Sequence, residues 1–287
     1  GNLTVNDLNA DGIALITNGT GDILIDAGAL IEINADVVAE IGNINVVAIQ
    51  SVAQNLDVDV TTAGGDITVV AGTTITTASG GVTSSAGGNI SYTGESDVIV
   101  GDMDASGANS ASEGSIVVTS AMGSITLNDT NTDGVALITN GTGDILIDAG
   151  ALIEINGSVV IEIGNIAVIS DASVTQSTDV VLTTQGGDIA INAGTTITVE
   201  IGGAAISNGG DIVYTAETDL IVGDVDASGA DSTTAEGSIV LNAVIGNLTV
   251  NDLNADGIAL ITNGTGDILI DAGALIEINA DVVAEIG

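Results

Sequence analysis

The fold of this chain is decided by residues 21–42, which read GDILIDAGALIEINADVVAEIG. Apolar and polar residues alternate through three short runs, as they do along strands with one buried face. The side chains that this alternation turns inward are Ile23, Ile25, Ile31, Ile33, Val37, Ala39 and Ile41. The carboxylates that it turns outward are Asp22, Asp26, Glu32, Asp36 and Glu40. Because a slip of one residue would bury every one of these carboxylates, the stretch predicts one coil made of three short strands.

The same alternation places several aliphatic side chains outside. They are Ile16, Leu24, Leu30 and Val38, with the equivalents Leu146, Leu152 and Val160. Outward aliphatic residues among carboxylates suggest lateral contact between copies of the chain. Scattered apolar residues are also normal on protein surfaces, so the interpretation as ordinary surface stays open.

The coil belongs to a long internal repeat. Residues 1–42 recur without change as 246–287, and a diverged copy begins at Gly123. The repeats are therefore 1–122, 123–245 and the partial copy 246–287, and we expect residues 1–287 to form a single continuous β-solenoid.

A shorter motif, Gly-[Asp/Asn/Ser]-Ile, marks the individual coils. In the first repeat it places isoleucines at 23, 44, 67, 90 and 116, and the series continues at 145, 166, 189, 212, 239 and 268. The spacing of about 21–29 residues is typical of one turn of a parallel β-helix. The sequence therefore predicts an all-β, right-handed parallel β-helix with three short strands per coil and five coils per repeat of 122 or 123 residues.

The composition excludes most enzyme chemistry and many partners. The chain has no Lys, Arg, His, Cys, Pro, Trp or Phe, and its 39 acidic residues give a formal charge of −39. Without imidazole, thiolate or amine groups we expect no catalytic site, and without basic residues no nucleic acid binding. No apolar run approaches the roughly 18 residues of a membrane helix, so membrane insertion is not expected. Such a charge requires cations as partners.

The stretches GDILIDAGALIEI at 21–33 and GDITVVAGTTIT at 65–76 resemble the coils of filamentous-haemagglutinin-like large exoproteins. The resemblance covers nearly the whole chain and implies a right-handed β-helix exported to a bacterial cell surface for adhesion or biofilm roles. The chain departs from that family in its complete lack of Lys and Arg and in the closeness of its repeats.

Two loops per repeat carry acidic patterns that suggest calcium binding. One pattern is Asp-x-Asn-x-Asp-Gly and the other is Asp-x-Asp-x-Ser-Gly. Alternate oxygen ligands in a tight loop suit Ca²⁺, although Asn18 stands where an EF-hand would carry its bidentate Glu. The predicted ligands are Asp7, Asn9 and Asp11, their copies Asp129, Asn131, Asp133, Asp252, Asn254 and Asp256, and Asp102, Asp104, Ser106, Asp224, Asp226 and Ser228.

Spacing within the coils places the two kinds of loop close together. Asp102 lies 14 residues after Gly88 and Asp129 lies 15 residues after Gly114. We therefore expect the loops to stack at one corner, about 4.8 Å apart along the axis, where each could complete the coordination sphere of the other. The same residue types are also the ordinary material of turns, and that alternative stays open.

These features favour a non-catalytic structural segment of an extracellular bacterial filament or giant surface protein, which bound Ca²⁺ would rigidify. Stacked coils can be extended by adding repeats, and each coil covers the strand edges of the next. The expected partners are divalent cations and further copies of the chain. The alternative is an adhesin that binds a host, surface or biofilm-matrix ligand along its flank, but the only aromatic residues, Tyr92 and Tyr214, fall on an inward column.

Overall fold

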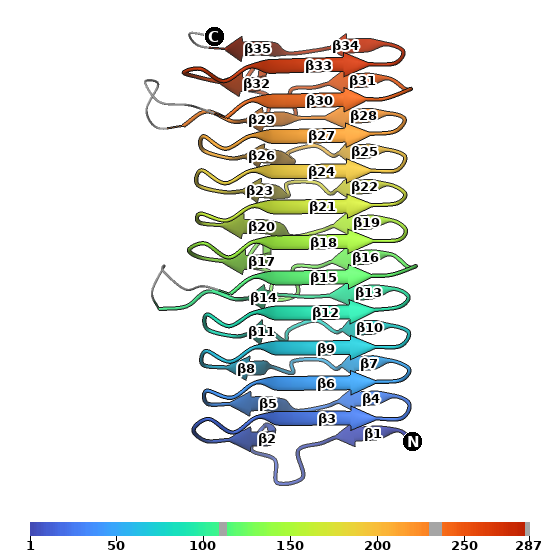
Figure 1. Ribbon diagram of the computed structural model, residues 1–287, viewed down its shortest axis with the longest axis vertical. Helices are drawn as coiled ribbons and strands as arrows, with labels where there is room; N and C mark the ends of the chain where they lie inside the picture. Colours follow the sequence, from blue (N-terminus) through green and yellow to red (C-terminus); the bar gives the residue numbers. More distant parts are fainter. Residues whose placement is uncertain (109–113, 230–236, 285–287) are drawn as a thin grey trace. The chain divides into compact units, whose positions relative to one another are not determined.

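The computed structural model describes residues 1–108, 114–229 and 237–284 (Figure 1). The chain divides into two compact units, Gly1–Gly150 and Ala151–Gly287, and this boundary does not coincide with a boundary of the sequence repeat. The described residues of each unit form β-strands, turns and loops, and no helix. Each unit contains three parallel sheets, called A, B and C here.

In the first unit, each coil contributes one strand to each sheet in turn. Sheet A consists of β1 (Leu3–Val5), β4 (Ile31–Ile33), β7 (Val52–Gln54), β10 (Ile75–Thr77), β13 (Val98–Val100) and β16 (Ile125–Leu127). Sheet B consists of β2 (Ile13–Thr17), β5 (Asp36–Ala39), β8 (Val60–Thr62), β11 (Thr83–Ser84), β14 (Met103–Asp104) and β17 (Val135–Thr139). Sheet C consists of β3 (Ile23–Ala27), β6 (Ile44–Ala48), β9 (Ile67–Ala71), β12 (Ile90–Gly94), β15 (Ile116–Ser120) and β18 (Ile145–Ala149).

The second unit repeats this arrangement. Sheet A consists of β19 (Ile153–Ile155), β22 (Val174–Gln176), β25 (Ile197–Val199), β28 (Leu220–Val222), β31 (Leu248–Val250) and β34 (Ile276–Ile278). Sheet B consists of β20 (Ser158–Ile161), β23 (Val181–Thr183), β26 (Ala204–Ile206), β29 (Asp224–Asp226), β32 (Ile258–Thr262) and β35 (Asp281–Ala284). Sheet C consists of β21 (Ile166–Ser170), β24 (Ile189–Ala193), β27 (Ile212–Ala216), β30 (Ile239–Ala243) and β33 (Ile268–Ala272).

The register of sheet C confirms the predicted coil length. Ile23 pairs with Ile44, and the series continues through Ile67 and Ile90 to Ile116. In the second unit Ile189 pairs with Ile212, and the isoleucine marks continue in the same way. Both units are therefore parallel β-solenoids with three strands per coil, as the motif spacing predicted.

Inward columns of aliphatic side chains form the core. Ile31, Val37 and Ile44 are fully buried, whereas none of the five carboxylates of residues 21–42 is buried. The prediction was wrong for Ile41, which is 52 % exposed. Strand β5 ends at Ala39, and the chain then turns a corner, so the alternation of the strand no longer determines where Ile41 points.

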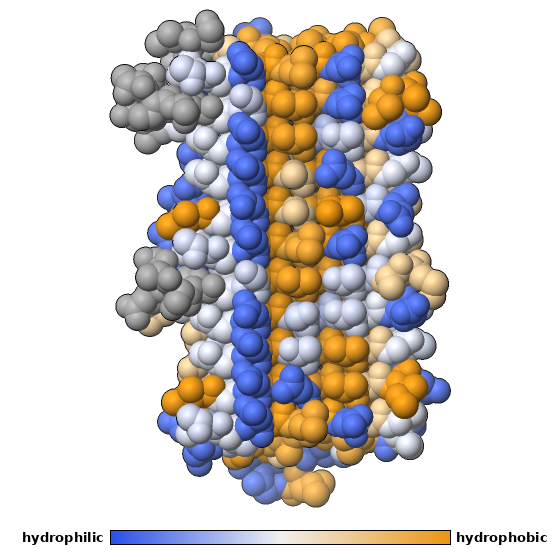
Figure 2. Space-filling model, viewed as in Figure 1, coloured by the Kyte–Doolittle hydropathy of each residue, from blue (hydrophilic) through white to orange (hydrophobic). Residues whose placement is uncertain are grey.

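In the first unit the outward aliphatic positions do not form an unbroken stripe. Leu24 is 69 % exposed, and Leu30 and Val38 are half-buried. In the register of sheet C, Leu24 pairs with Asn45, which pairs in turn with Thr68. In the second unit the corresponding column is apolar throughout, with Ala167, Ala190, Val213, Val240 and Leu269 in register, and Figure 2 shows a run of hydrophobic residues along this face.

The glycine of the coil motif is required by close packing of consecutive coils. A Cβ atom on Gly42 would lie 2.0 Å from the carbonyl oxygen of Gly21, and one on Gly65 would lie 2.2 Å from that of Gly42. In the second unit, a Cβ on Gly210 would lie 2.1 Å from the carbonyl oxygen of Gly187. Because no side chain fits at such distances, only glycine lets the corners stack.

The second residue of the motif bonds to the next coil. Asp22 Oδ1 accepts a hydrogen bond from the backbone N–H of Asn43 at 2.8 Å, and Asn43 Oδ1 accepts one from that of Asp66 at 2.8 Å. In the second unit, Asp188 Oδ1 accepts one from the N–H of Asp211 at 2.8 Å. Asp, Asn and Ser can all supply the acceptor oxygen, which explains their exchange at this position. Figure 2 shows hydrophilic residues gathered in a narrow column on this face.

Candidate cation site

The loop between β16 and β17 is closed by its own polar side chains. Asp129 Oδ2 accepts the N–H of Gly134 at 2.8 Å, Asn131 Oδ1 accepts that of Asp133 at 2.9 Å, and Asp133 Oδ1 accepts that of Val135 at 2.8 Å. The loop turns through two left-handed residues, Thr132 with φ of 66° and Gly134 with φ of 94°. Side-chain acceptors of this kind stabilise tight turns, so the Asp-x-Asn-x-Asp-Gly pattern folds locally.

This loop lies against the preceding coil. Asp102, just before β14, accepts three hydrogen bonds at Oδ2: from Thr130 Oγ1 at 2.5 Å, from the N–H of Asn131 at 2.8 Å and from the N–H of Thr130 at 3.2 Å. The carbonyl oxygen of Thr130 accepts the N–H of Gly80, which lies one coil further back, at 3.2 Å. The predicted stacking of the two acidic loops is therefore present in the first unit.

The stacking brings three carboxylates together. One oxygen each of Asp102, Asp129 and Asp133 lies within 4.8 Å of the others, and we call this group the first cluster. Asp102 is only 6 % exposed, and its Oδ1 has no hydrogen-bond partner. Asp102 and Asp133 also line a cavity of about 210 Å³, whose other walls include Val135 and Ile138.

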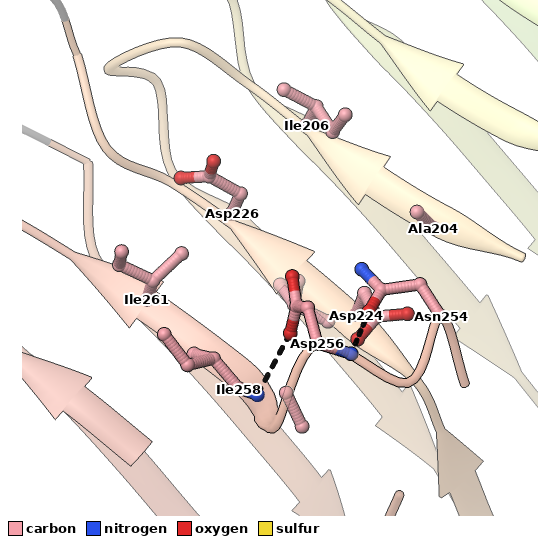
Figure 3. A pocket seen from close by; sticks show the side chains of 10 residues that line it. Ala204, Ile206, Asp224, Asp226, Asn254, Asp256, Ile258 and Ile261 are labelled. Carbon is pink, nitrogen blue, oxygen red and sulfur yellow. Dashed lines mark hydrogen bonds between the residues drawn. The ribbon is translucent and has the colours of Figure 1, made fainter. Parts of the chain in front are cut away.

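The second unit contains the same arrangement. One oxygen each of Asp224, Asp252 and Asp256 lies within 4.8 Å of the others, and we call this group the second cluster. Figure 3 shows Asn254 and Asp256 of the loop standing over Asp224 of β29, at a cavity that is also about 210 Å³. Both oxygens of Asp224 are buried and without a hydrogen-bond partner.

The environment of each central aspartate opposes its negative charge. Burial raises the pKa of Asp102, although hydrogen bonds from Thr130 and Asn131 act against this effect. Burial, together with the charges of Asp252 and Asp256, raises the pKa of Asp224 to about 6. Both shifts follow from placing a carboxylate in a poorly solvated position beside other carboxylates. The clusters therefore favour any ligand that brings positive charge.

The structure does not bring all of the predicted ligands into the clusters. Asp104 lines the cavity, but its Oδ1 accepts the N–H of Ser106 at 2.8 Å in a turn of its own, and Asp226 and Ser228 repeat this contact. Figure 3 shows Asp226 further along β29 than Asp224 and away from Asn254. The two kinds of loop therefore contribute unequally, with one aspartate from the coil that contains β14 or β29 and two from the following coil.

The first loop, Asp7–Gly12, closes in the same way. Asp7 accepts the N–H groups of Asn9, Ala10 and Gly12 at 2.9, 2.7 and 2.7 Å. These hydrogen bonds, that from Gly12 foremost, lower the pKa of Asp7. Among the described residues only the first and second clusters bring three acidic side chains together, and Asp7, Asn9 and Asp11 belong to neither.

Sequence reasoning missed one contributor to the geometry. The hydroxyl of Thr130 holds Asp102 in the first cluster, whereas Leu253 occupies the equivalent position in the second. Position 130 is variable among the three copies of the loop, with Leu8 in the first, and it lies between the predicted ligands. Nothing in the pattern of carboxylates marks it.

Comparison with known proteins gave no match: no family model, no curated protein and no solved structure matches the chain. Within the described part of the chain there is no helix of the length and apolarity needed to cross a membrane. Tyr92 and Tyr214 are each 1 % exposed and lie in the core, as predicted, so neither is available for stacking on a ligand at the surface.

Proposed function

We propose that this chain is a non-catalytic structural segment of an extracellular bacterial filament or surface stalk, whose length is set by the number of repeats. Its secretion to the cell surface is part of the proposal and rests on the resemblance of 21–33 and 65–76 to coils of filamentous-haemagglutinin-like exoproteins.

The observation that carries the proposal is that each coil joins the next through contacts that the repeat itself supplies. In-register pairing, stacked glycines and the side-chain acceptor of the coil motif recur in both units. A further repeat therefore needs no interface that is not already encoded. In solenoids of this kind, stability is approximately a sum of repeat and nearest-neighbour terms, which suits a protein that varies in length.

The proposal is tested by adding one further copy of residues 123–245 to the chain and measuring both proteins by small-angle X-ray scattering. Five added coils at about 4.8 Å each should lengthen the particle by about 24 Å without changing its cross-section. A thicker particle of unchanged length, or a change of oligomeric state in place of elongation, would contradict axial addition of repeats.

A further inference from the structure

We propose that the first and second clusters each bind one Ca²⁺, which holds two consecutive coils together. The proposal goes beyond the stalk function, because the evidence for the two sites is their geometry and does not depend on whether the chain belongs to a filament. Asp102 comes from one coil and Asp129 and Asp133 from the next, so an ion bound to all three joins elements that are 27 to 31 residues apart in the sequence.

The first argument is the unpartnered oxygen of Asp102. Asp102 is only 6 % exposed, and it lines the cavity beside Asp133. Its Oδ1 atom has neither a hydrogen bond nor access to solvent. A buried carboxylate oxygen without a partner is costly, and the cost is removed when an ion binds it. The second unit repeats the arrangement with both oxygens of Asp224 unpartnered.

The second argument is the charge of the chain. Buried carboxylates in proteins are normally paired with Lys, Arg or His, but this sequence contains none of these residues. The countercharge of each cluster must therefore come from outside the chain, as a metal cation, a proton or an organic cation.

The ligand chemistry favours Ca²⁺ over the other cations. Carboxylate oxygens within 4.8 Å of one another fit a shared ion with metal–oxygen distances of about 2.3–2.6 Å. Ca²⁺ tolerates irregular sets of six to eight oxygens that include carboxylates, amide oxygens and water, whereas Mg²⁺ requires a near-ideal octahedron. Asn131 and Asp104 line the same cavity, which has room for water molecules as further oxygen ligands.

The test is calorimetric titration of the 287-residue protein with CaCl₂ after treatment with EDTA, together with thermal unfolding in CaCl₂, MgCl₂ and NaCl at matched ionic strength. We expect two Ca²⁺ per chain in the tightest class. Asp102→Asn should lower the Ca²⁺ affinity of one of these sites, and Asp224→Asn that of the other, by roughly tenfold or more. Circular dichroism in EDTA checks that the variants fold.

A second readout uses the opposite effects of the same substitutions with and without the ion. In EDTA, Asp102→Asn and Asp224→Asn remove buried repulsion and should raise the unfolding temperature, whereas in CaCl₂ they should lower it relative to the original chain. The matched control is Asp66→Asn with Asp188→Asn, which removes the same charge from a column where Asn43 and Asn165 occur naturally. This control should keep both Ca²⁺ sites.

Three outcomes would overturn the proposal. They are Ca²⁺ binding that Asp102→Asn and Asp224→Asn leave unchanged, stabilisation by NaCl equal to that by CaCl₂, and stabilisation by spermidine equal to that by CaCl₂, which would assign the cavities to organic cations. If the two central variants fail to fold, Asp133→Asn and Asp256→Asn replace them, because both side chains are exposed ligands of the same clusters.

Discussion

The first and second clusters contain the same three acids in the same places and differ in the residue that faces the central aspartate. In the first cluster the hydroxyl of Thr130 donates a hydrogen bond to Asp102. In the second cluster Leu253 occupies this position, packs over the backbone of Gly223 and has no side-chain donor. Asp102 Oδ2 therefore accepts the hydroxyl of Thr130 as well as two backbone N–H groups, whereas Asp224 has no side-chain donor at either oxygen. The backbone therefore builds both clusters, and one side chain changes the hydrogen bonding of the central aspartate.

The largest expected effect comes from replacing the two glycines, Gly101 and Gly223, against which the loops of the following coils pack. A Cβ on Gly101 would lie 2.5 Å from Thr130 Oγ1, and a Cβ on Gly223 would lie 2.2 Å from Leu253 Cδ1. Gly101→Ala and Gly223→Ala should therefore each lower the free energy of unfolding by about 1–3 kcal/mol, measured by urea denaturation. Both should also weaken Ca²⁺ binding at their own cluster, because each loop must move away from its central aspartate.

The control for these glycines is Gly21→Ala, where the nearest atom to a new Cβ is Thr17 Cβ at 3.7 Å, an ordinary contact. It should change the free energy of unfolding by less than about 0.5 kcal/mol. A stability loss for Gly21→Ala as large as that for Gly101→Ala would show that the loss comes from replacing glycine in the backbone and not from a clash with the loop.

A smaller effect is expected from pH in calcium-free protein. The pKa of Asp224 is raised to about 6 in the folded chain, above its ordinary value of 3.8. Between these two pH values the folded state binds more protons than the unfolded state, so the free energy of unfolding should fall as the pH rises from about 4 to about 6. Thermal unfolding in EDTA across this range, compared with Asp224→Asn, isolates the contribution of this side chain.

Bound Ca²⁺ favours the ionised carboxylate, so in CaCl₂ the fall in the free energy of unfolding between about pH 4 and about pH 6 should be smaller than in EDTA, or reversed. Identical pH profiles for the original chain and Asp224→Asn would contradict the assignment. Solvent reaches part of the second cluster, so the slope should be shallower than that of a fully buried group.

The sequence was sufficient to predict the coils, because alternation and a repeated motif act together over many turns. Ile23 and Ile31 fall where the pattern places them, since a strand fixes which of its faces each residue occupies. Ile41 did not, because it follows the end of β5 and lies in a corner that the alternation does not govern. The sequence also did not reveal why the motif requires glycine, because the constraint is the close distance between consecutive coils and not a local turn.

The candidate site could be predicted only in part. The loop containing Asp129 and its position against Asp102 followed from residue spacing and turn chemistry. The pattern that joined Asp102 with Asp104 and Ser106 in one chelating loop did not lead to a cluster, because Asp104 is the last residue of the short strand β14 and bonds to its own turn. The burial of Asp102 arises from the loop of the next coil, and no local pattern around residue 102 contains that information.

The smallest expected effect is the conversion of the second cluster into a copy of the first. Leu253→Thr should place a hydroxyl where Thr130 has one, and its hydrogen bond to Asp224 should lower the pKa of this carboxyl by about one unit, since a hydrogen bond to a charged group contributes about 1.5 kcal/mol or more. Nuclear magnetic resonance titration of the Asp224 carboxyl carbon in EDTA measures the shift. The matched control is Leu8→Thr in the first loop, where the side chain is 94 % exposed and stability should change by less than about 0.5 kcal/mol. If Leu253→Thr leaves the pKa of Asp224 unchanged, the difference between the clusters lies in the packing of the loop and not in the missing hydroxyl.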